Sequence, residues 1–263
     1  MLPSMFLSHG SPVLPLTDAP AKRFLAGLGA AIDQRYGRPK AILVASAHWE
    51  TDTPDVGAMA VNDTIHDFHG FPPALYRLRY PAPGLGDLAG RVAARLREAG
   101  FAASTDPARG LDHGAWVPLL SMYPEADIPV GQLSIQPHLG PEHHLRLGKA
   151  LAPLREEGML ILGSGGLTHN LREIGAFRDT PDAASPPWVA DFAAWMDAAL
   201  AGRRIGDLLA YRRLAPHAVR NHPTDEHLLP LFVALGAGGD AVPEHVHDSA
   251  TYGILRMDAY AFG

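Results

Sequence analysis

The chain has 263 residues, a formal net charge of −6 and an isoelectric point near 6.1. A net negative chain has no basic field to attract nucleic acid or anionic lipid, so neither a nucleic acid nor a membrane is expected as a partner. The absence of cysteine excludes disulfides, thiolate metal sites and cysteine nucleophiles. With 47% hydrophobic residues and no linker, the sequence predicts one catalytic domain over residues 1–263.

The first nine residues lack the basic segment and the unbroken apolar core of a signal peptide. No apolar run approaches the ~20 residues that a membrane-spanning helix needs. We therefore expect a cytoplasmic protein.

Short apolar runs alternate with helical patterns along the chain. In chain order, the sequence predicts a strand over 5–8, a helix over 18–36, strands over 41–47 and 57–61, a helix over 85–99, a strand over 128–135, a helix over 141–157, a strand over 159–162, helices over 188–201, 205–214 and 226–235, and a strand over 251–257. Residues 178–187 read as a surface loop. The unbroken apolar run over 41–47 (AILVASA) is typical of a strand covered on both faces. This alternation predicts an α/β single-domain sandwich with a central, mostly parallel sheet flanked by helices.

The positions of the 14 histidines suggest where the functional site lies. His9 and His48 each sit just past the carboxyl end of a predicted strand, and His169 follows another strand through a glycine-rich turn. Ligands of open α/β sheets bind at this edge. Taken singly, His9 and His48 are equally compatible with a histidine satisfied by backbone in a tight turn. The alternative for His169 is an incidental histidine next to a helix cap formed by Thr168.

Two further histidines stand in motifs with a functional and a structural interpretation. His227 follows Asp225 and Thr224, either of which could cap the predicted helix, so it lies near the start of that helix and points either into a cleft or to solvent. His113 lies between Asp112 and a glycine before a short apolar helix, as a substrate contact or as part of a capping turn.

A metal site in a chain without cysteine must use imidazole and carboxylate ligands. Neutral imidazole suits Fe(II) and Zn(II) alike. A catalytic site needs about three protein ligands and open positions for the substrate. Three histidines on separate loops, with a fourth left free for proton transfer, meet this description.

Six motifs occur in order: SHGSP, SAHWE, HDF–GFP with LYRLRYPAPG, GLDHGAWVPL, GSGGLTHNL and HPTDEHLLPL. Together they resemble the class III extradiol ring-cleavage dioxygenases, in particular the branch that is similar to DOPA 4,5-dioxygenase. The resemblance implies that His9, His48 and His227 ligate a metal, that His169 is the catalytic acid and base, and that His113 acts on the substrate side. The wider superfamily more often supplies a glutamate as third ligand. A contribution from Glu226, or from His222 behind the ligands, therefore stays open.

The resemblance also implies the reaction: opening of a catechol-type ring, DOPA-like or another ortho-diphenol, with both atoms of O₂. Fe(II) is the expected working ion, although Zn(II) binds nitrogen ligands more tightly and can occupy the site in purified protein. A zinc-dependent hydrolase using the same histidines is one alternative. A scaffold of the same fold without activity is another.

Overall fold

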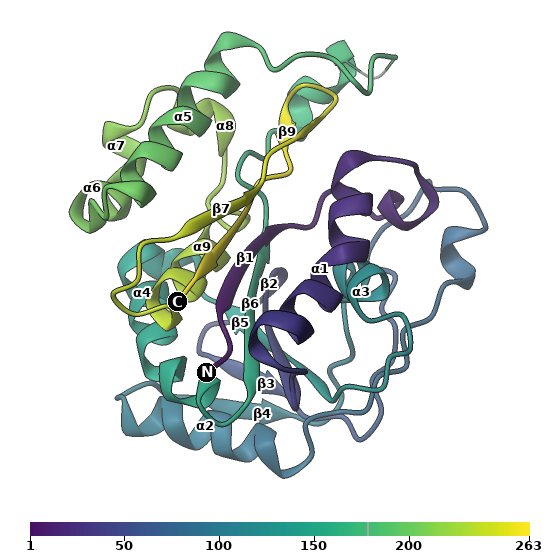
Figure 1. The fold of residues 1–263 in the computed structure, drawn as a ribbon, viewed down its shortest axis with the longest axis vertical. Coiled ribbons are helices and arrows are strands. Elements are labelled where there is room, and N and C mark those ends of the chain that lie inside the picture. Colours follow the sequence, from purple (N-terminus) through teal and green to yellow (C-terminus); the bar gives the residue numbers. More distant parts are fainter. Residues whose placement is uncertain (178) are drawn as a thin grey trace.

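An eight-stranded sheet runs through the molecule and carries the two chain ends on neighbouring strands (Figure 1). The structure is a computed structural model that describes residues 1–177 and 179–263. Across the sheet the strand order is β4-β3-β5-β2-β6-β1-β10-β7. The strands are β1 (Ser4–Ser8), β2 (Ala41–Glu50), β3 (Asp55–Gly57), β4 (Ser104–Asp106), β5 (Val130–Ile135), β6 (Met159–Gly165), β7 (Glu244–His247) and β10 (Ala259–Phe262), and a separate hairpin pairs β8 (Ala250–Thr251) with β9 (Leu255–Arg256).

The four strands β5, β2, β6 and β1 are parallel, so their carboxyl ends meet at one edge of the sheet. On one side β10 and β7 continue the sheet with antiparallel pairing. On the other side β3 pairs antiparallel with β5 and parallel with β4. The predicted α/β sandwich with a central, mostly parallel sheet flanked by helices is confirmed.

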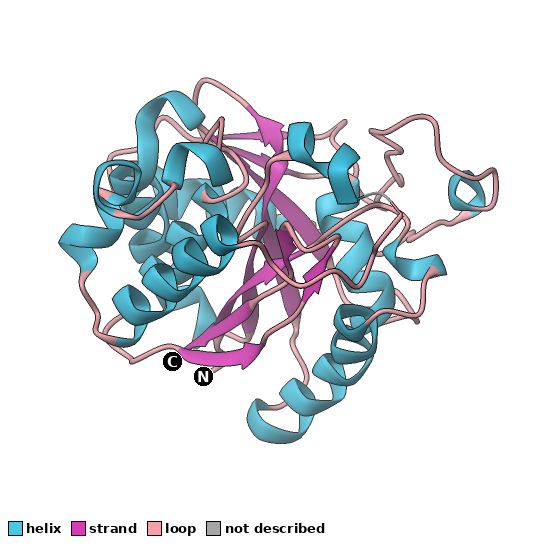
Figure 2. Cartoon of the chain, turned by 90° about the horizontal axis from the view of Figure 1, so that it is seen from above, coloured by secondary structure: helices cyan, strands magenta, loops and turns pink. Residues whose placement is uncertain are grey.

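Helices cover both faces of this sheet (Figure 2). Along β2, Ile42 and Val44 pack in the apolar cluster on one face of the sheet, whereas Leu43 and Ala45 pack in the cluster on the other face. Every residue of 41–47 is buried, as predicted for a strand with helices on both sides. The helices are α1 (Pro20–Tyr36), α2 (Asp87–Glu98), α3 (His113–Met122), α4 (Gly140–Leu151), α5 (Pro187–Ala201), α6 (Ile205–Leu209), α7 (Tyr211–Leu214), α8 (Ala218–Asn221) and α9 (Leu229–Ala237). None of the described helices is long and apolar enough to cross a membrane.

Three predicted elements differ from the structure. The strand expected over 57–61 lies earlier in the chain, as β3, and ends at Gly57. It does not continue because Ala60 and Asn62 bond to the backbone of residues 82–84 rather than to a neighbouring strand. The helix expected over 205–214 is interrupted at Ala210 and forms α6 and α7. The strand expected over 251–257 is a hairpin that turns at Tyr252 and Gly253, both with positive φ, and the final strand of the sheet is β10. Of the loop expected over 178–187, residue 178 lies outside the described residues.

The boundaries of two predicted helices also shift. The α1 helix begins at Pro20 rather than at residue 18, and Asp18 makes an ion pair with Arg23 instead of capping the helix. The helix predicted over 141–157 ends as α4 at Leu151 and continues as a 3-10 turn (Ala152–Arg155), because Pro153 cannot supply the amide that an α-helix needs there.

Gly165, the last residue of β6, lets that strand pass close to the segment before α9. A Cβ atom at Gly165 would lie 2.0 Å from the carbonyl oxygen of His227. We expect Gly165→Ala to lower the free energy of unfolding by about 1–3 kcal/mol or more and to displace His227, as measured by urea unfolding and metal affinity. Gly27→Ala is the matched control, because a Cβ on Gly27 in α1 meets nothing within 4 Å. Equal behaviour of the two variants would contradict the packing argument.

Candidate metal centre and active site

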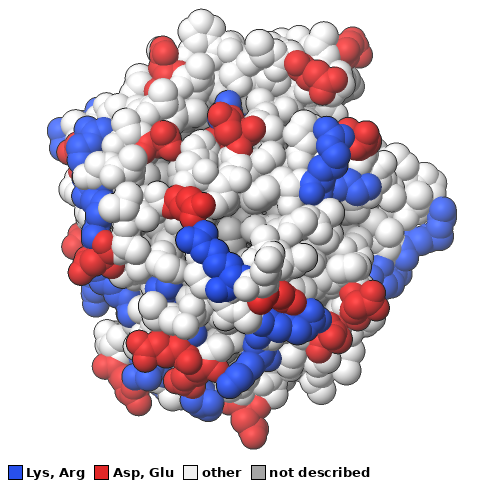
Figure 3. Space-filling view, viewed as in Figure 1, with Lys and Arg blue, Asp and Glu red and all other residues white. Residues whose placement is uncertain are grey.

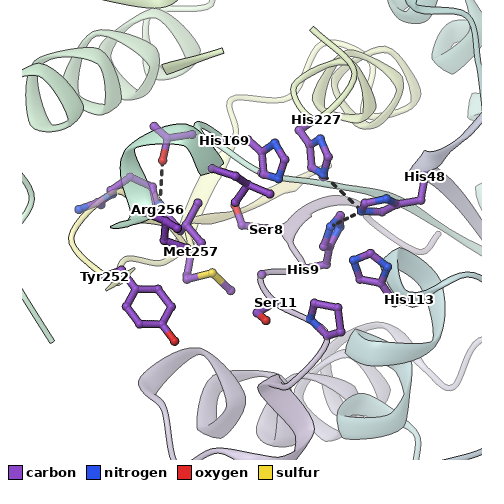
Figure 4. A pocket seen from close by; sticks show the side chains of 18 of the residues that line it. Ser8, His9, Ser11, His48, His113, His169, His227, Tyr252, Arg256 and Met257 are labelled. Atoms are coloured by element: carbon purple, nitrogen blue, oxygen red, sulfur yellow. Dashed lines mark hydrogen bonds between the residues drawn. The ribbon is translucent and has the colours of Figure 1, made fainter. Parts of the chain in front are cut away.

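All five histidines singled out in the sequence line one cleft of about 400 Å³ at the carboxyl edge of the parallel strands (Figure 4). These are His9, His48, His113, His169 and His227. They come from five separate segments that only the folded sheet brings together. The cleft is therefore the candidate functional site.

The strand ends position three of these side chains. His9 directly follows β1, as predicted, and His169 lies four residues beyond β6. His48 lies inside β2 rather than past its end, because that strand continues to Glu50. In this part of β2 the pairing with β5 is irregular between Ala45 and Glu50. The fourth side chain, His113, is the first residue of α3.

The sequence predicted that His227 lies near the start of the helix. In the structure His227 lies in a turn just before α9. The helix begins only at Leu229, with Pro230 in its first turn, a position where proline is favoured. Neither predicted capping side chain caps it. The Asp225 carboxylate instead bonds the Tyr211 hydroxyl and Arg212. Placing His227 in a turn directs its ring into the cleft.

Three ring nitrogens converge at the centre of the site. The Nε2 atoms of His9 and His48 lie 3.0 Å apart, and those of His48 and His227 lie 3.3 Å apart, as the dashed lines of Figure 4 show. Ligand nitrogens about 2.1 Å from one ion are about 3.0 Å apart at right angles and about 3.4 Å apart at tetrahedral angles. The two measured separations match this range.

The hydrogen bonds of the other ring nitrogens decide where the protons sit. The Ser164 hydroxyl donates to the carbonyl of Gly114, so it can only accept from Nδ1 of His9, which lies 3.0 Å away. Nδ1 of His227 lies 2.8 Å from a carboxylate oxygen of Glu226, which also only accepts. Both Nε2 atoms therefore carry lone pairs that face Nε2 of His48. A single N–H on Nε2 of His48 could satisfy only one of these lone pairs, whereas a cation between the three nitrogens would accept a lone pair from each, so the residues fit a bound metal ion.

Two further groupings of ligand atoms are close enough to hold an ion. The first group has one ring nitrogen from each of His9, His48 and His113, all within 4.8 Å of one another. The second group has one ligand atom from each of His169, Glu226 and His227, within the same limit. The direct Nε2 contacts run across these groups, from His9 through His48 to His227. We favour His9, His48 and His227, because their Nε2 atoms contact one another directly.

Asp67 holds His113, and the sequence did not identify it. Its carboxylate accepts from the backbone N–H of His113 at 3.0 Å and from Nδ1 of the ring at 2.9 Å. The same carboxylate lies 3.7 Å from Nδ1 of His48. Burial alone would raise the pKa of Asp67, but the hydrogen bonds and charge of His113 lower it to about 2. Asp67 therefore fixes the ring of His113 with its proton on Nδ1.

His169 stacks on His227 with ring centroids 3.3 Å apart and an angle of 11° between the rings. Its Nδ1 lies 4.0 Å from Glu226. Burial lowers the pKa of His169 to about 4, so the ring is neutral at pH 7 and can accept a proton. Glu226 thus lies beside one candidate ligand and one candidate proton carrier.

Five further histidines lie outside the cleft. His222 is fully buried and its Nε2 donates to the carbonyl of Leu167 at 2.8 Å, so it supports the segment that carries His169. His143 and His144 bond separate atoms of Gln136. His245 bonds Asp258 and Asp197, and His247 stacks on Phe24. None of these five side chains reaches the converging nitrogens.

Acidification is expected to destabilise the metal-free protein. Burial lowers the pKa of His48, His169 and His222 to about 4, whereas a histidine in the unfolded chain titrates near 6.5. Between these values the unfolded chain binds more protons. The free energy of unfolding is therefore fully retained above about pH 6.5, falls as the pH drops towards 4, and then levels off.

Urea unfolding between pH 7.5 and 4 measures this dependence. His169→Gln should make it shallower, and loss of the exposed His69 in His69→Gln should leave it unchanged. A stability that does not change between pH 7 and 4.5 would contradict the buried, neutral state of these rings.

Asp67→Asn is expected to lower turnover by about 10–100-fold, the usual effect of losing a carboxylate that orients an active-site histidine. The amide can accept only one of the two hydrogen bonds from His113 and must present N–H to the other. Steady-state kcat with a catechol measures the effect. Asp63→Asn, an exposed change in the same segment, should leave kcat unaltered. Equal kcat in both variants would show that the ring of His113 needs no carboxylate.

Comparison with known proteins identifies the family. Residues 3–263 match the family model described as the catalytic LigB subunit of aromatic ring-opening dioxygenase. The chain belongs to the LigB family. It is 47% identical to the 4,5-DOPA dioxygenase extradiol of Beta vulgaris, over 98% of this chain and 96% of the relative. It is 40% identical to that of Escherichia coli K12, over 90% and 85%. The crystal structure of an uncharacterized protein from the same bacterium is similar with a TM-score of 0.82, at 34% identity and with full coverage of both chains.

The LigB family consists of extradiol ring-cleaving dioxygenases, so the enzyme class implied by the six motifs is confirmed. Membership of this family favours a ring-cleaving dioxygenase over the two alternatives, a zinc-dependent hydrolase and a scaffold without activity. The histidine cluster that could hold a metal lies where the parallel strands end.

Proposed function

We propose that this enzyme opens the ring of a catechol with both atoms of O₂, using Fe(II) held by His9, His48 and His227. The observation that carries the proposal is the convergence of three Nε2 atoms at 3.0 and 3.3 Å, two of them held without a proton. The names of the relatives favour DOPA or a similar ortho-diphenol as substrate. We further propose that residues 1–263 form one catalytic domain, since one sheet joins both chain ends, and that the protein is cytoplasmic.

Bound Fe(II) supplies the redox chemistry that joins the catechol to O₂, whereas Zn(II) can occupy the same nitrogens without that chemistry. We therefore expect purified protein to carry zinc until it is reconstituted with iron. The protein itself supplies the orientation of the three imidazoles through Ser164, Glu226 and the nearby Asp67.

His169 is proposed to take a proton from a catechol hydroxyl and to return it later in the reaction. It is neutral at pH 7 because burial lowers its pKa, and it lines the cleft beside His227. A positioned acid or base of this kind contributes about 10²–10⁴-fold to the rate.

His113 is proposed to act on the substrate side. Because Asp67 holds the proton on Nδ1, the neutral ring offers a lone pair at Nε2 and accepts a hydrogen bond from a catechol hydroxyl. It donates a hydrogen bond from Nε2 only after it has gained a proton, and the Asp67 carboxylate then stabilises the charged ring.

Oxygen consumption by protein reconstituted anaerobically with Fe(II) tests the proposed function. We expect oxygen uptake with at least one member of a catechol panel, together with a yellow ring-opened product. Zinc-loaded protein should consume no oxygen. If the iron-loaded protein takes up no oxygen with any ortho-diphenol, the proposed function is wrong.

A further inference from the structure

Asp112 directly precedes His113 in the chain, but its side chain is fully buried and does not line the cleft. Figure 3 shows that acidic side chains are spread over the visible surface of the molecule, where water solvates them. A buried carboxylate loses that hydration and is stable only with hydrogen-bonding or charged partners. The partners of Asp112 therefore indicate what this residue does.

Asp112 stands just before the first residue of α3, where an aspartate usually accepts a hydrogen bond from the amides of its own helix. Its side chain makes no such bond, and the amide of His113 donates to Asp67 instead. The carboxylate of Asp112 accepts from three donors outside the helix: the Ser46 hydroxyl at 2.7 Å, Nε2 of Gln132 at 2.6 Å and Nη2 of Arg109 at 2.6 Å. Asp112 is therefore the centre of a buried polar network and not a helix cap.

The network holds the backbone of His48. This residue lies in the part of β2 where the pairing with β5 is irregular, so its backbone groups need other partners. The amide of His48 donates to the Ser46 hydroxyl at 3.2 Å, and its carbonyl accepts from Nη2 of Arg109 at 3.4 Å. Because the Asp112 carboxylate only accepts, Ser46 gives its hydroxyl hydrogen to Asp112 and is left as an acceptor for the His48 amide. Both backbone groups of His48 are thus held by side chains that are bonded to Asp112.

The first turn of α3 packs directly on the same network. A Cβ atom at Gly114 would lie 2.5 Å from the Ser46 hydroxyl and 3.2 Å from an oxygen of the Asp112 carboxylate. It would also lie 3.2 Å from the ring of His48. The rings of His48 and His113 are neighbours in Figure 4, with centroids 3.9 Å apart. Asp112 therefore connects the two segments, β2 and the start of α3, that carry these rings.

We propose that Asp112 is a positioning residue, which acts through Ser46 and Arg109 to set the place of His48 in the candidate metal site and relative to His113. The proposal rests on the proposed function for the role of His48 as a metal ligand. It assigns Asp112 a task different from that of Asp67, which bonds the ring of His113 directly, because Asp112 reaches His48 only through the side chains that hold the His48 backbone.

Ser46→Ala tests the proposal, because it removes the acceptor of the His48 amide and leaves the Arg109–Asp112 ion pair in place. We expect the zinc affinity to fall by about 10–100-fold, the usual effect of losing a group that orients a metal ligand. Competition with a chromophoric chelator measures the affinity, and urea unfolding of the metal-free protein measures the stability.

Ser4→Ala is the matched control. Ser4 is also a fully buried serine in a parallel strand, and its hydroxyl donates to the carbonyl of Ala234 at the end of β1 that lies away from the cleft. This variant should lose stability, as expected for a lost buried hydrogen bond, and bind zinc like the unaltered protein. If Ser46→Ala binds zinc as tightly as Ser4→Ala does, the network has only a structural role and the proposal is overturned.

A double-variant cycle with Asp112→Asn shows whether Ser46 acts through Asp112. The asparagine amide has one acceptor oxygen, so it cannot satisfy all three donors of the network. We expect Ser46→Ala to lower the zinc affinity less in the Asp112→Asn background than in the unaltered protein. Fold-losses that simply multiply would contradict the coupling. Should Asp112→Asn fail to fold, the comparison of Ser46→Ala with Ser4→Ala decides alone.

A failure of this proposal can be distinguished from a failure of the proposed function. Oxygen uptake and zinc affinity of the unaltered protein test the reaction and the metal site, and neither depends on a variant of the network. If the unaltered protein binds zinc and its iron-loaded form cleaves a catechol, equal zinc affinities of the two serine variants would contradict the positioning role alone.

Discussion

His227→Ala is expected to reduce metal affinity more than the loss of a residue that only orients a ligand. Such a loss typically lowers metal affinity by about 10–100-fold. The variant removes one of three nitrogens that converge within 3.3 Å of a neighbour. The site would then keep His9 and His48, too few to hold a catalytic ion in the usual way. Competition between the zinc-loaded protein and a chromophoric chelator measures the affinity, and iron content after reconstitution confirms it.

Two further variants make this result decisive. His143→Ala removes a half-buried histidine that bonds Gln136 outside the cleft, so it should bind metal like the unaltered protein. His113→Ala should also retain metal, because Asp67 holds that ring by its own hydrogen bonds. If His113→Ala loses the metal and His227→Ala keeps it, the ligands are His9, His48 and His113.

His169→Gln is expected to keep its metal and to lose turnover. The glutamine can still fill the space beside His227, but it cannot take a proton from the substrate at neutral pH. We expect kcat to fall by about 10²–10⁴-fold, the usual contribution of a positioned acid or base. The iron-loaded variant is compared with the unaltered protein by initial rates of oxygen uptake at saturating catechol, with metal content measured on the same samples.

Comparing lost activity with lost metal in each variant distinguishes a metal ligand from a proton carrier. His227→Ala should lose activity in proportion to its lost metal, whereas His169→Gln should be inactive with a full complement of metal. A comparable loss of metal in both variants would mean that His169 is a ligand and that the two residues act together with Glu226, which lies beside both rings.

Much of the architecture follows from local sequence patterns. The apolar run over 41–47 predicts a buried strand because a strand with helices on both faces of its sheet buries consecutive residues, and β2 has all seven buried. The run over 5–8, closed by Gly10 and Pro12, likewise places His9 directly after β1. The final 20 residues were harder to predict, because the pairing of β10 with β1 joins segments more than 250 residues apart.

The sequence by itself determined which residue types were available for the chemistry. Without cysteine any metal site had to use histidine and carboxylate, and strand ends in an α/β sheet pointed to His9, His48 and His169 as neighbours. For His113 and His227 the local motifs allowed a structural role as readily as a functional one. The family resemblance, and not the local pattern, singled out these two residues.

Only the tertiary structure decided how these side chains are held. Asp67, Ser164 and Glu226 fix the protons of His113, His9 and His227, and two of these partners lie 46 and 155 residues from the ring that they bond. No local sequence pattern encodes such contacts, because they depend on where separate loops meet after the sheet has formed. The same is true of the wall of the cleft, where Nε and Nη2 of Arg256 are paired with Asp258 and Asp248.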